Sequence, residues 1–269
     1  MTSYGLELLE VGMTRVVVYG AGRLGQAIIA ASEMDTETQV KVVAAVDEHL
    51  VKTRGEDALA IPLYRSLKEA SVASDFDVVI DSSRADALNE VLKFAVEKGK
   101  PLVIAATGHD AQQIEQIRQA AEKVPLLRSS NLSLGVNVLR RLVENAGAML
   151  GSVDTEVVEA HHRLKVDAPS GTALTLAEAV RDSTDPSRQF VYGRRPDEVG
   201  ARGNEIGVHS VRGGTVVGEH TVTFLLNDEV VELRHVAQSR DVFGFGALRA
   251  AAFVAGLPAG YYTMEDLLG

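Results

Sequence analysis

The sequence predicts an α/β fold with a parallel sheet, joined to a second part of α+β character. Two observations carry this prediction. Over the first half of the 269 residues, short β-branched runs alternate with segments of helical spacing, a pattern typical of a parallel sheet covered by helices on both faces. After about residue 132 the alternation stops and β-rich segments become frequent, which indicates an antiparallel or mixed sheet.

The first half contains four expected strands, each a short apolar or β-branched run. They are residues 15–19 (RVVVY), 40–46 (VKVVAAV), 76–81 (FDVVID) and 101–105 (PLVIA). Helical spacing follows three of them, and the expected helices run from the first strand to about residue 32, over residues 85–98 and over residues 111–123.

In the second half, Ala173, Leu176, Ala177 and Val180 recur at the spacing of one helical face. The other elements expected there are helices at 135–149 and 246–255 and strands at 155–161, 206–211, 220–226 and 230–237, the last two joined by a tight turn at 227–229. The stretch 182–202, rich in Pro, Arg and Asp, is expected to be an exposed loop.

The change of pattern predicts two domains. Residues 1–131 are expected to form the α/β domain, completed by residues 240–269, and residues 132–239 are expected to form the inserted second domain.

Composition restricts the class of protein. The net charge of −10 argues against a broad nucleic-acid surface, and no apolar run approaches the roughly 20 residues of a membrane helix. Residues 1–13 lack the basic start and apolar core of a secretory signal, so a cytoplasmic location is expected. Cysteine is absent, which excludes disulfides and thiolate metal sites.

The first chemical motif is a glycine-rich turn. Gly20, Gly22 and Gly25 are spaced G-x-G-x-x-G between a predicted strand and a predicted helix, as in a dinucleotide-binding turn. The first glycine permits the turn, the second lets the backbone approach a pyrophosphate, and the third allows close helix–sheet packing. The motif predicts a Rossmann-type domain that binds a nicotinamide dinucleotide, and a glycine turn without a cofactor is the less favoured interpretation.

Acidic residues after the second strand bear on the choice of coenzyme. Asp47 ends that strand, where its carboxylate can accept hydrogen bonds from the adenosine ribose. Glu48 follows, and two carboxylates repel a 2′-phosphate. We therefore expect NADH as the preferred cofactor and NADPH as the second choice, with Arg23, Lys52 or Arg54 able to weaken the preference.

The second motif lies in residues 158–178 (VEAHHRLKVDAPSGTALTLAE). Successive side chains on a strand point to opposite faces, so His161 and His162 can serve one site only if the strand ends or bends there. The residues Asp-Ala-Pro-Ser that follow indicate a turn.

The same motif predicts the start of a helix. Pro169 and Gly171 suit such a start, with Ser170 or Thr172 as the cap. Free N–H groups there, beside Lys165 and two imidazoles, predict a carboxylate-binding site with groups that can transfer a proton. A solvated strand end with an ordinary capped helix is the less favoured interpretation.

No metal site and no serine nucleophile are expected in this motif. Adjacent histidines are not spaced as ligands on one helix face, and no third ligand is apparent. Ser170 lacks the strand–elbow–helix setting of G-x-S-x-G.

Residues 159–173 (EAHHRLKVDAPSGTA) resemble a motif of the 4-hydroxy-tetrahydrodipicolinate reductase (dihydrodipicolinate reductase) family. Three further segments resemble family motifs in the same order, so that the resemblance covers most of the chain from Gly20 onward. They are residues 129–139 (SSNLSLGVNVL), 211–224 (VRGGTVVGEHTVTF) and 235–251 (HVAQSRDVFGFGALRAA).

The resemblance implies a Rossmann-type domain completed by the last helix, and an inserted α+β domain that carries the substrate site and builds a homotetramer. It also implies a reaction in lysine and diaminopimelate biosynthesis. A nicotinamide hydride reduces a C=C bond in a cyclic, imine-conjugated dicarboxylate, the dehydrated form of 4-hydroxy-tetrahydrodipicolinate, and tetrahydrodipicolinate is formed.

The resemblance also implies the site residues. His161 is expected to be the acid/base group, with Lys165 as its charged or proton-donating partner. The residues expected to bind the small dicarboxylate are His162, Lys165, Ser170, Gly171, Thr172 and Arg240. Those expected to bind the dinucleotide are Gly20, Gly22, Arg23, Leu24, Gly25, Asp47, Ala105, Thr107, Gly108, Ser130 and Asn131.

Three coenzyme loops depart from the family pattern. The first, G-A-G-R-L-G, is one residue tighter than the frequent G-x-x-G-R-M-G. Residues 105–108 (AATG) stand where G-T-T-G is usual, and residues 82–85 (SSRA) stand in place of F-T-x-P. These departures concern the coenzyme and leave the substrate motif intact.

Two other functions compete with this interpretation. One is a different Rossmann dehydrogenase that acts on another small anion, and the segments after residue 129 argue against it. The other is a non-catalytic dinucleotide-sensing protein, for which the complete set of His161, His162 and Lys165 would be unexpected.

Overall fold

The computed structural model describes residues 12–195 and 200–269, so the expectation for the first 13 residues falls almost wholly outside the described residues. The chain forms two compact units. Unit 1 consists of two segments, the described residues up to Leu132 and Phe243–Gly269. Unit 2 is Ser133–Val242, which lies between them in the sequence. In the described part of the chain, no helix combines the length and the apolarity that crossing a membrane requires.

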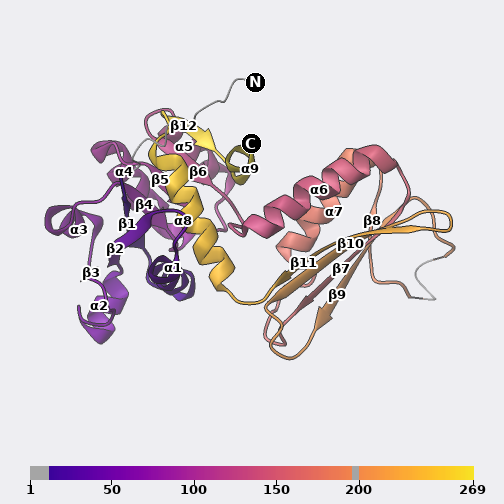
Figure 1. Cartoon of the computed structure of the whole chain (residues 1–269), viewed down its shortest axis with the longest axis horizontal. Helices are drawn as coiled ribbons and strands as arrows, with labels where there is room; N and C mark the ends of the chain where they lie inside the picture. The colour runs from indigo at the N-terminus through magenta and orange to yellow at the C-terminus, as the bar shows by residue number, and fades with distance from the viewer. Residues whose placement is uncertain (1–11, 196–199) are drawn as a thin grey trace, which may run out of the picture. The chain divides into compact units, whose positions relative to one another are not determined.

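Unit 1 is built on a seven-stranded sheet with the order β12-β6-β5-β4-β1-β2-β3, in which all neighbours are parallel (Figure 1). The order reverses between β1 and β4, and ligands of such sheets bind beyond the carboxyl ends of the strands at this point. The strands are β1 Thr14–Tyr19, β2 Val40–Val46, β3 Leu63–Tyr64, β4 Val78–Asp81, β5 Leu102–Ile104, β6 Pro125–Arg128 and β12 Gly260–Tyr262.

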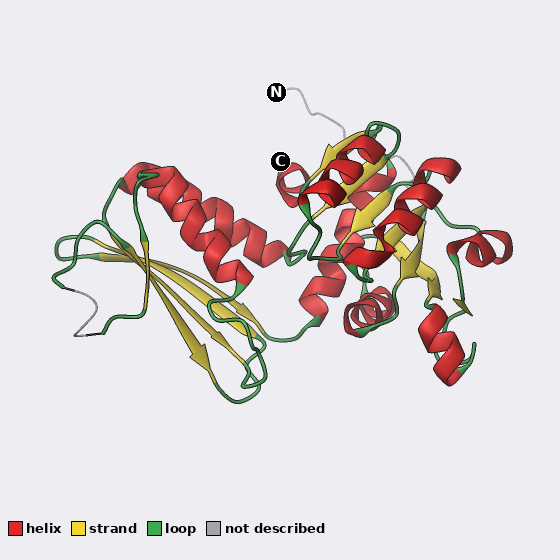
Figure 2. Cartoon of the chain, turned by 180° about the vertical axis from the view of Figure 1, so that it is seen from behind, coloured by secondary structure: helices red, strands yellow, loops and turns green. Residues whose placement is uncertain are grey.

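Helices cover both faces of this sheet (Figure 2). Because both faces are buried, Val16, Val17 and Val18 are all fully buried, which explains the unbroken apolar run of β1. One face packs against α3, α4 and α5, and the other against α1, α8 and α9. The helices of unit 1 are α1 Arg23–Met34, α2 Glu48–Arg54, α3 Leu67–Ala73, α4 Leu88–Lys98, α5 Ala111–Ala121, α8 Asp241–Ala255 and α9 Met264–Leu268, and a 3-10 turn, Ala85–Ala87, precedes α4.

Unit 2 contains a five-stranded mixed sheet with the order β11-β10-β7-β9-β8. β10 is antiparallel to β7 and β11, whereas β9 is parallel to β7 and β8. The elements are α6 Leu134–Leu150, β7 Asp154–His161, α7 Gly171–Thr184, β8 Phe190–Tyr192, β9 Ile206–Arg212, β10 Gly218–Leu225 and β11 Val230–Ala237.

Two helices, α6 and α7, cover one face of this sheet (Figure 2). Along β7 the side chains alternate: Thr155, Val157 and Glu159 are buried on the helix side, and Val158 is exposed on the opposite side. We call that opposite side the open face. Residues paired across neighbouring strands lie on the same face, so the strand register shows which side chains share the open face. Five exposed apolar side chains lie on it, namely Val158, Val211, Leu225, Val230 and Val236.

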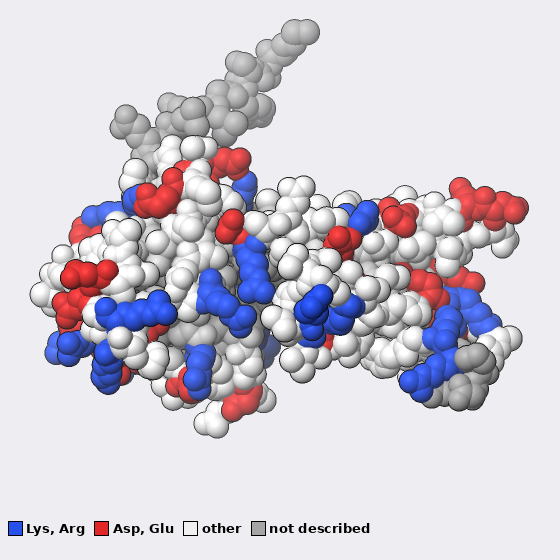
Figure 3. All heavy atoms as spheres, turned by 90° about the horizontal axis from the view of Figure 1, so that it is seen from below, with Lys and Arg blue, Asp and Glu red and all other residues white. Residues whose placement is uncertain are grey.

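Charged side chains gather near one end of the open face. The Glu156 carboxylate lies 2.7 Å from Arg194 Nη2 and 2.6 Å from His209 Nε2, and it also pairs with Arg202. Figure 3 shows basic (blue) and acidic (red) side chains side by side at the right-hand end of the view. Opposite charges at these distances offset one another.

The predicted fold class is confirmed, and most predicted elements form within about two residues of their expected bounds. The helix expected at residues 246–255 begins earlier, at Asp241. The sequence analysis did not predict the short elements α2, β3, α3, β6, β8, β12 and α9.

The expectation of an exposed loop over residues 182–202 is wrong in part. Helix α7 continues to Thr184, strand β8 follows, and Arg188 is only 3% exposed. The guanidinium of Arg188 donates to the backbone carbonyls of Val153 and Asn204, at 3.0 and 3.1 Å. A buried guanidinium needs such acceptors, and composition alone does not reveal them.

Helix α8 approaches the rest of unit 1 closely at Gly246. A Cβ atom at this position would lie 1.7 Å from the carbonyl oxygen of Leu132. We expect Gly246→Ala to lower the free energy of unfolding by about 1–3 kcal/mol, because the backbone must move apart. The control Gly256→Ala, where a Cβ meets nothing within 4 Å, should change it little. Urea unfolding measures both, and equal midpoints for the two variants would contradict this packing.

Candidate functional site

The predicted coenzyme residues of unit 1 lie at one edge of its sheet. The glycine turn follows β1, Asp47 follows β2, Ala105 to Gly108 follow β5, and Ser130 and Asn131 follow β6. Since these strands are parallel, their carboxyl ends meet at the same edge. The topology therefore brings together loops that are separated by more than 100 residues in the sequence.

The three glycines of the turn are required for different structural reasons. Gly20 has a φ of +92°, and a Cβ there would lie 2.7 Å from Ser83 Cα. A Cβ on Gly25 would lie 2.0 Å from the carbonyl oxygen of Gly20, so the protein's own packing requires both glycines.

Gly22 differs, because a Cβ there would meet no atom within 4 Å. It is the N-cap of α1 and makes no side-chain cap hydrogen bond, so the first N–H groups of the helix, beside Arg23 and Leu24, face no cap. Backbone N–H groups at a helix start with open space before them fit a dinucleotide pyrophosphate.

Asp47 fastens this turn to the next strand. Its Oδ2 accepts from the N–H of Ala21 at 3.0 Å, and its Oδ1 accepts from the N–H of Leu50 at 2.9 Å, capping α2. Each carboxylate oxygen has two acceptor positions, so a ribose hydroxyl can still donate to it.

The loop at residues 82–83, whose sequence departs from the family pattern, is stabilised by hydrogen bonds. Ser82 Oγ donates to the carbonyl of Gly20 at 2.7 Å, and Ser83 donates from its N–H and Oγ to Asp81. Burial raises the pKa of Asp81, and the Ser83 hydrogen bonds oppose that rise. Ser82 thus ties the glycine turn to the end of β4, and Ser83 ties the loop to Asp81.

The predicted substrate residues of unit 2 gather where β7 ends. Glu159, on this strand, is completely buried and is the centre of the arrangement. Its carboxylate accepts from Arg212 Nη1 and Nη2, both at 2.7 Å, and from the N–H of Ser170 at 3.1 Å. Burial opposes the negative charge, but these hydrogen bonds outweigh it and lower the pKa of Glu159 to about 2.

His161, the last residue of β7, lies against this carboxylate. Its Nδ1 is 2.6 Å from Glu159 Oε2, and its ring meets the His220 ring edge to face with centroids 5.1 Å apart. A Cβ on Gly218 would lie 3.0 Å from His161 Nε2, so this glycine makes room for the ring. Burial lowers the pKa of His161, and Glu159 offsets only part of that effect.

His162 and Lys165 have other partners. His162 Nε2 lies 3.1 Å from Arg240 Nη2, which brings two predicted substrate residues together. Lys165 Nζ lies 2.9 and 2.8 Å from the two carboxylate oxygens of Asp167. The adjacent histidines therefore occupy different environments, as expected from a strand that ends between them.

Ser170 acts as a helix cap. Its Oγ accepts from the N–H of Ala173 at 3.1 Å and lies 3.2 Å from His220 Nε2, and its N–H donates to Glu159. The residue is 1% exposed, so its polar groups serve the protein's own structure. Gly171 opens α7 at the surface, and Thr172 follows it.

Glu159, Arg212 and His220 also belong to this cluster, although the sequence pattern did not predict them as members. Strand alternation could have indicated Glu159, which stands two residues before His161 and so shares its face. Arg212 and His220 stand within the segment that resembles the family, but the pattern alone did not show what they contact.

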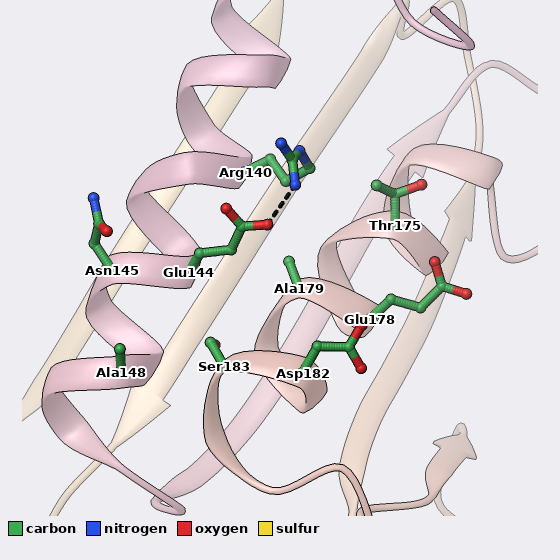
Figure 4. Close-up of a pocket in the computed structure, with 9 residues that line it drawn as sticks. All are labelled: Arg140, Glu144, Asn145, Ala148, Thr175, Glu178, Ala179, Asp182 and Ser183. Carbon is green, nitrogen blue, oxygen red and sulfur yellow. Dashed lines mark hydrogen bonds and ion pairs between the residues drawn. The ribbon is translucent and has the colours of Figure 1, made fainter. Parts of the chain in front are cut away.

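A separate cavity of about 480 Å³ lies between α6 and α7 (Figure 4). Its charged lining consists of Arg140, Glu144, Glu178 and Asp182, and Arg140 pairs with Glu144. None of the predicted site residues lines it, so this cavity is distinct from the cluster at the end of β7.

Unit 1 has a parallel sheet with a glycine turn at the point where the strand order reverses. Unit 2 carries two adjacent histidines, a lysine and arginines. Together these features define a pyridine-nucleotide-dependent oxidoreductase. Matches to family models identify the family of this oxidoreductase. Residues 14–132 match the model for the N-terminus of dihydrodipicolinate reductase, and residues 135–268 match the model for its C-terminus. The chain belongs to the dihydrodipicolinate reductase family.

Individual relatives agree with this assignment. The chain is 43% identical over 257 residues to a 4-hydroxy-tetrahydrodipicolinate reductase of Caldanaerobacter subterraneus subsp. tengcongensis, covering 95% of this chain and 98% of the relative. It is 41% identical over 260 residues to the enzyme of the same name from Methanocorpusculum labreanum, covering 96% of this chain and 100% of the relative.

A solved structure is also similar. The dihydrodipicolinate reductase of Paenisporosarcina sp. TG-14, with dipicolinate bound, superposes with a TM-score of 0.77 at 25% identity, covering 94% of this chain and 99% of that one. A myo-inositol dehydrogenase from Corynebacterium glutamicum, at 15% identity and a TM-score of 0.58, shares the fold alone.

Proposed function

We propose that the chain catalyses the NAD(P)H-dependent reduction of 4-hydroxy-tetrahydrodipicolinate, by way of its dehydrated form, to tetrahydrodipicolinate in lysine and diaminopimelate biosynthesis. The similarity to reductases of that name over nearly the whole chain carries this proposal. The substrate class is supported by the relative that holds dipicolinate, a small cyclic dicarboxylate. The balanced change is the addition of one hydride and one proton and the loss of one water.

The coenzyme is assigned to the carboxyl edge of the sheet in unit 1. Gly22 and the start of α1 would hold the pyrophosphate, and Asp47 the adenosine ribose. The loops after β5 and β6, with Ala105, Thr107, Gly108, Ser130 and Asn131, would hold the nicotinamide half. Bound there, the nicotinamide supplies the hydride.

Unit 2 supplies the substrate groups. His162, Arg240, Gly171, Thr172 and the Lys165 ammonium would bind the two carboxylates, as cations and N–H donors at a helix start suit them. Ser170 would contribute through its cap of α7 rather than by direct contact, since it is buried.

His161 is the proposed acid/base group, with Lys165 as its charged partner. Its Nε2 lies beside Gly218, which carries no side chain to cover it. Once protonated at Nε2, an imidazole with a pKa below its usual value gives up that proton readily, and a proton is needed at a ring carbon after reduction.

We expect His161→Gln and Lys165→Ala each to lower kcat by about 100-fold or more, because a positioned proton donor is lost. NADH binding, measured by fluorescence titration, should persist in both. Arg163→Ala is a matched control between the two positions, since its side chain is exposed. Near-normal turnover in both variants would exclude these roles.

NADH is the proposed preferred coenzyme. We expect kcat/KM to be higher with NADH than with NADPH, because the carboxylates of Asp47 and Glu48 repel a 2′-phosphate. Asp47→Asn keeps an oxygen for one of the two backbone hydrogen bonds and removes the charge, so the NADPH:NADH ratio should rise by about 5-fold, or ~1 kcal/mol. Asp228→Asn, in the turn between β10 and β11, should leave the ratio unchanged. A clear NADPH advantage in the unaltered protein would contradict the proposal.

A homotetramer is proposed from the family resemblance, with the open face of unit 2 as the contact surface. Five apolar side chains stand on one regular sheet face that no helix described in unit 2 covers, which favours a second copy as the occupant. We expect light scattering to give the mass of four chains and Val158→Asp to reduce it, whereas Val72→Asp, on exposed α3, should not. A monomeric unaltered protein would refute the assembly. The cytoplasmic location stays a prediction.

A further inference from the structure

The contacts of Glu159 determine which hydrogen each neighbour must present. Its Oε1 accepts from Arg212 Nη2 and the N–H of Ser170, and its Oε2 accepts from Arg212 Nη1. These three donors cannot act as acceptors. The carboxylate is therefore held as an anion, which a side-chain hydrogen bond from Ser210 also supports, and the contact from His161 Nδ1 at 2.6 Å must come from an N–H donor as well.

The tautomer of His161 follows from this. When Nδ1 carries the hydrogen, Nε2 of the neutral ring is a free acceptor. Nε2 lies beside Gly218, where the absence of a Cβ leaves space. The ring also makes an edge-to-face contact with the His220 ring.

The charges around His161 balance each other. Without a cationic partner, the buried Glu159 carboxylate would hold the imidazole protonated. The bidentate ion pair with Arg212 neutralises that carboxylate. Lys165 adds a further positive charge nearby. Burial keeps His220 neutral, with its pKa at about 4, so it adds no charge of its own. His161 thus gains a fixed orientation from Glu159 without being locked in the cationic form.

We propose that Glu159 is the positioning residue that fixes the Nδ1–H tautomer of His161 and directs Nε2 outward, and that Arg212 is the counter-ion that keeps this imidazole able to exchange its proton. The inference rests on the proposed function, in which His161 is the acid/base group. Glu159 is fully buried, so it acts through His161.

Glu159→Gln tests the tautomer. The single amide oxygen should face Arg212 Nη2 and the Ser170 N–H, which turns the NH2 group toward His161 Nδ1 and favours the Nε2–H tautomer. Nitrogen NMR of histidine-labelled protein, with His161 assigned by its loss in His161→Gln, should show Nδ1–H in the unaltered protein and the reverse in the variant. We expect kcat to fall by about 10- to 100-fold, with KM for the dicarboxylate changing less than 3-fold.

Two variants should move the titration of His161 in opposite directions. Removing the anion in Glu159→Gln lowers the pH at which His161 titrates, whereas removing the cation in Arg212→Gln raises it. The limb of the kcat/KM profile that follows His161 should move with it. A role in packing alone would not produce shifts of opposite sign, and the Arg212 variant keeps the test available if Glu159→Gln folds poorly.

Glu156→Gln is the matched control. Glu156 lies on the same strand, on the open face, and makes an equivalent 2.6 Å contact with His209. It should alter neither the tautomer nor the titration of His161. An Nε2–H tautomer in the unaltered protein, or unchanged His161 titration in both Glu159→Gln and Arg212→Gln, would overturn the inference. A lack of reductase turnover in the unaltered protein would instead overturn the proposed function, because the NMR measurements need no substrate.

Discussion

A carboxylate that is removed from water stays charged only where donors surround it, and unit 2 is organised around one such group, the side chain of Glu159. Each donor comes from a different element. Arg212 ends β9, Ser170 caps α7, and His161 ends β7. Satisfying one buried charge therefore sets where a strand ends, where a helix begins and how an imidazole is oriented. In the proposed function, stability and chemistry would depend on the same set of hydrogen bonds.

In unit 1, backbone geometry rather than a buried charge fixes the shape of the coenzyme turn. Gly20 and Gly25 are needed because neighbouring backbone and side-chain atoms come too close for any Cβ, whereas Gly22 leaves space unfilled. Asp47 and Ser82 hold the turn from either side, through hydrogen bonds to Ala21 and Gly20. The unusual residues at positions 82 and 83 belong to this support, so a changed loop sequence still maintains the same turn.

The sequence predicted those parts of the fold that local patterns determine. The β-branched runs and the G-x-G-x-x-G spacing sufficed for the parallel sheet and its glycine turn, and the alternation along β7 separated His161 from His162. Pairings between distant residues could not be read in this way. Glu159 and Arg212 are 53 residues apart and meet because β7 and β9 run parallel, and Arg188 is buried by carbonyls from two other segments. Strands of two or three residues, such as β3 and β8, are too short to show a period.

The two ends of the described chain share one core. Val16 and Val18 of β1 pack in the same cluster as Ala247, Leu248 and Ala251 of α8, which follow the whole of unit 2 in the sequence. During synthesis on the ribosome, unit 2 is complete before the last layer of unit 1 exists. The domain that begins first is thus the one that finishes last, and this sheet face is covered only by α1 until α8 and α9 emerge.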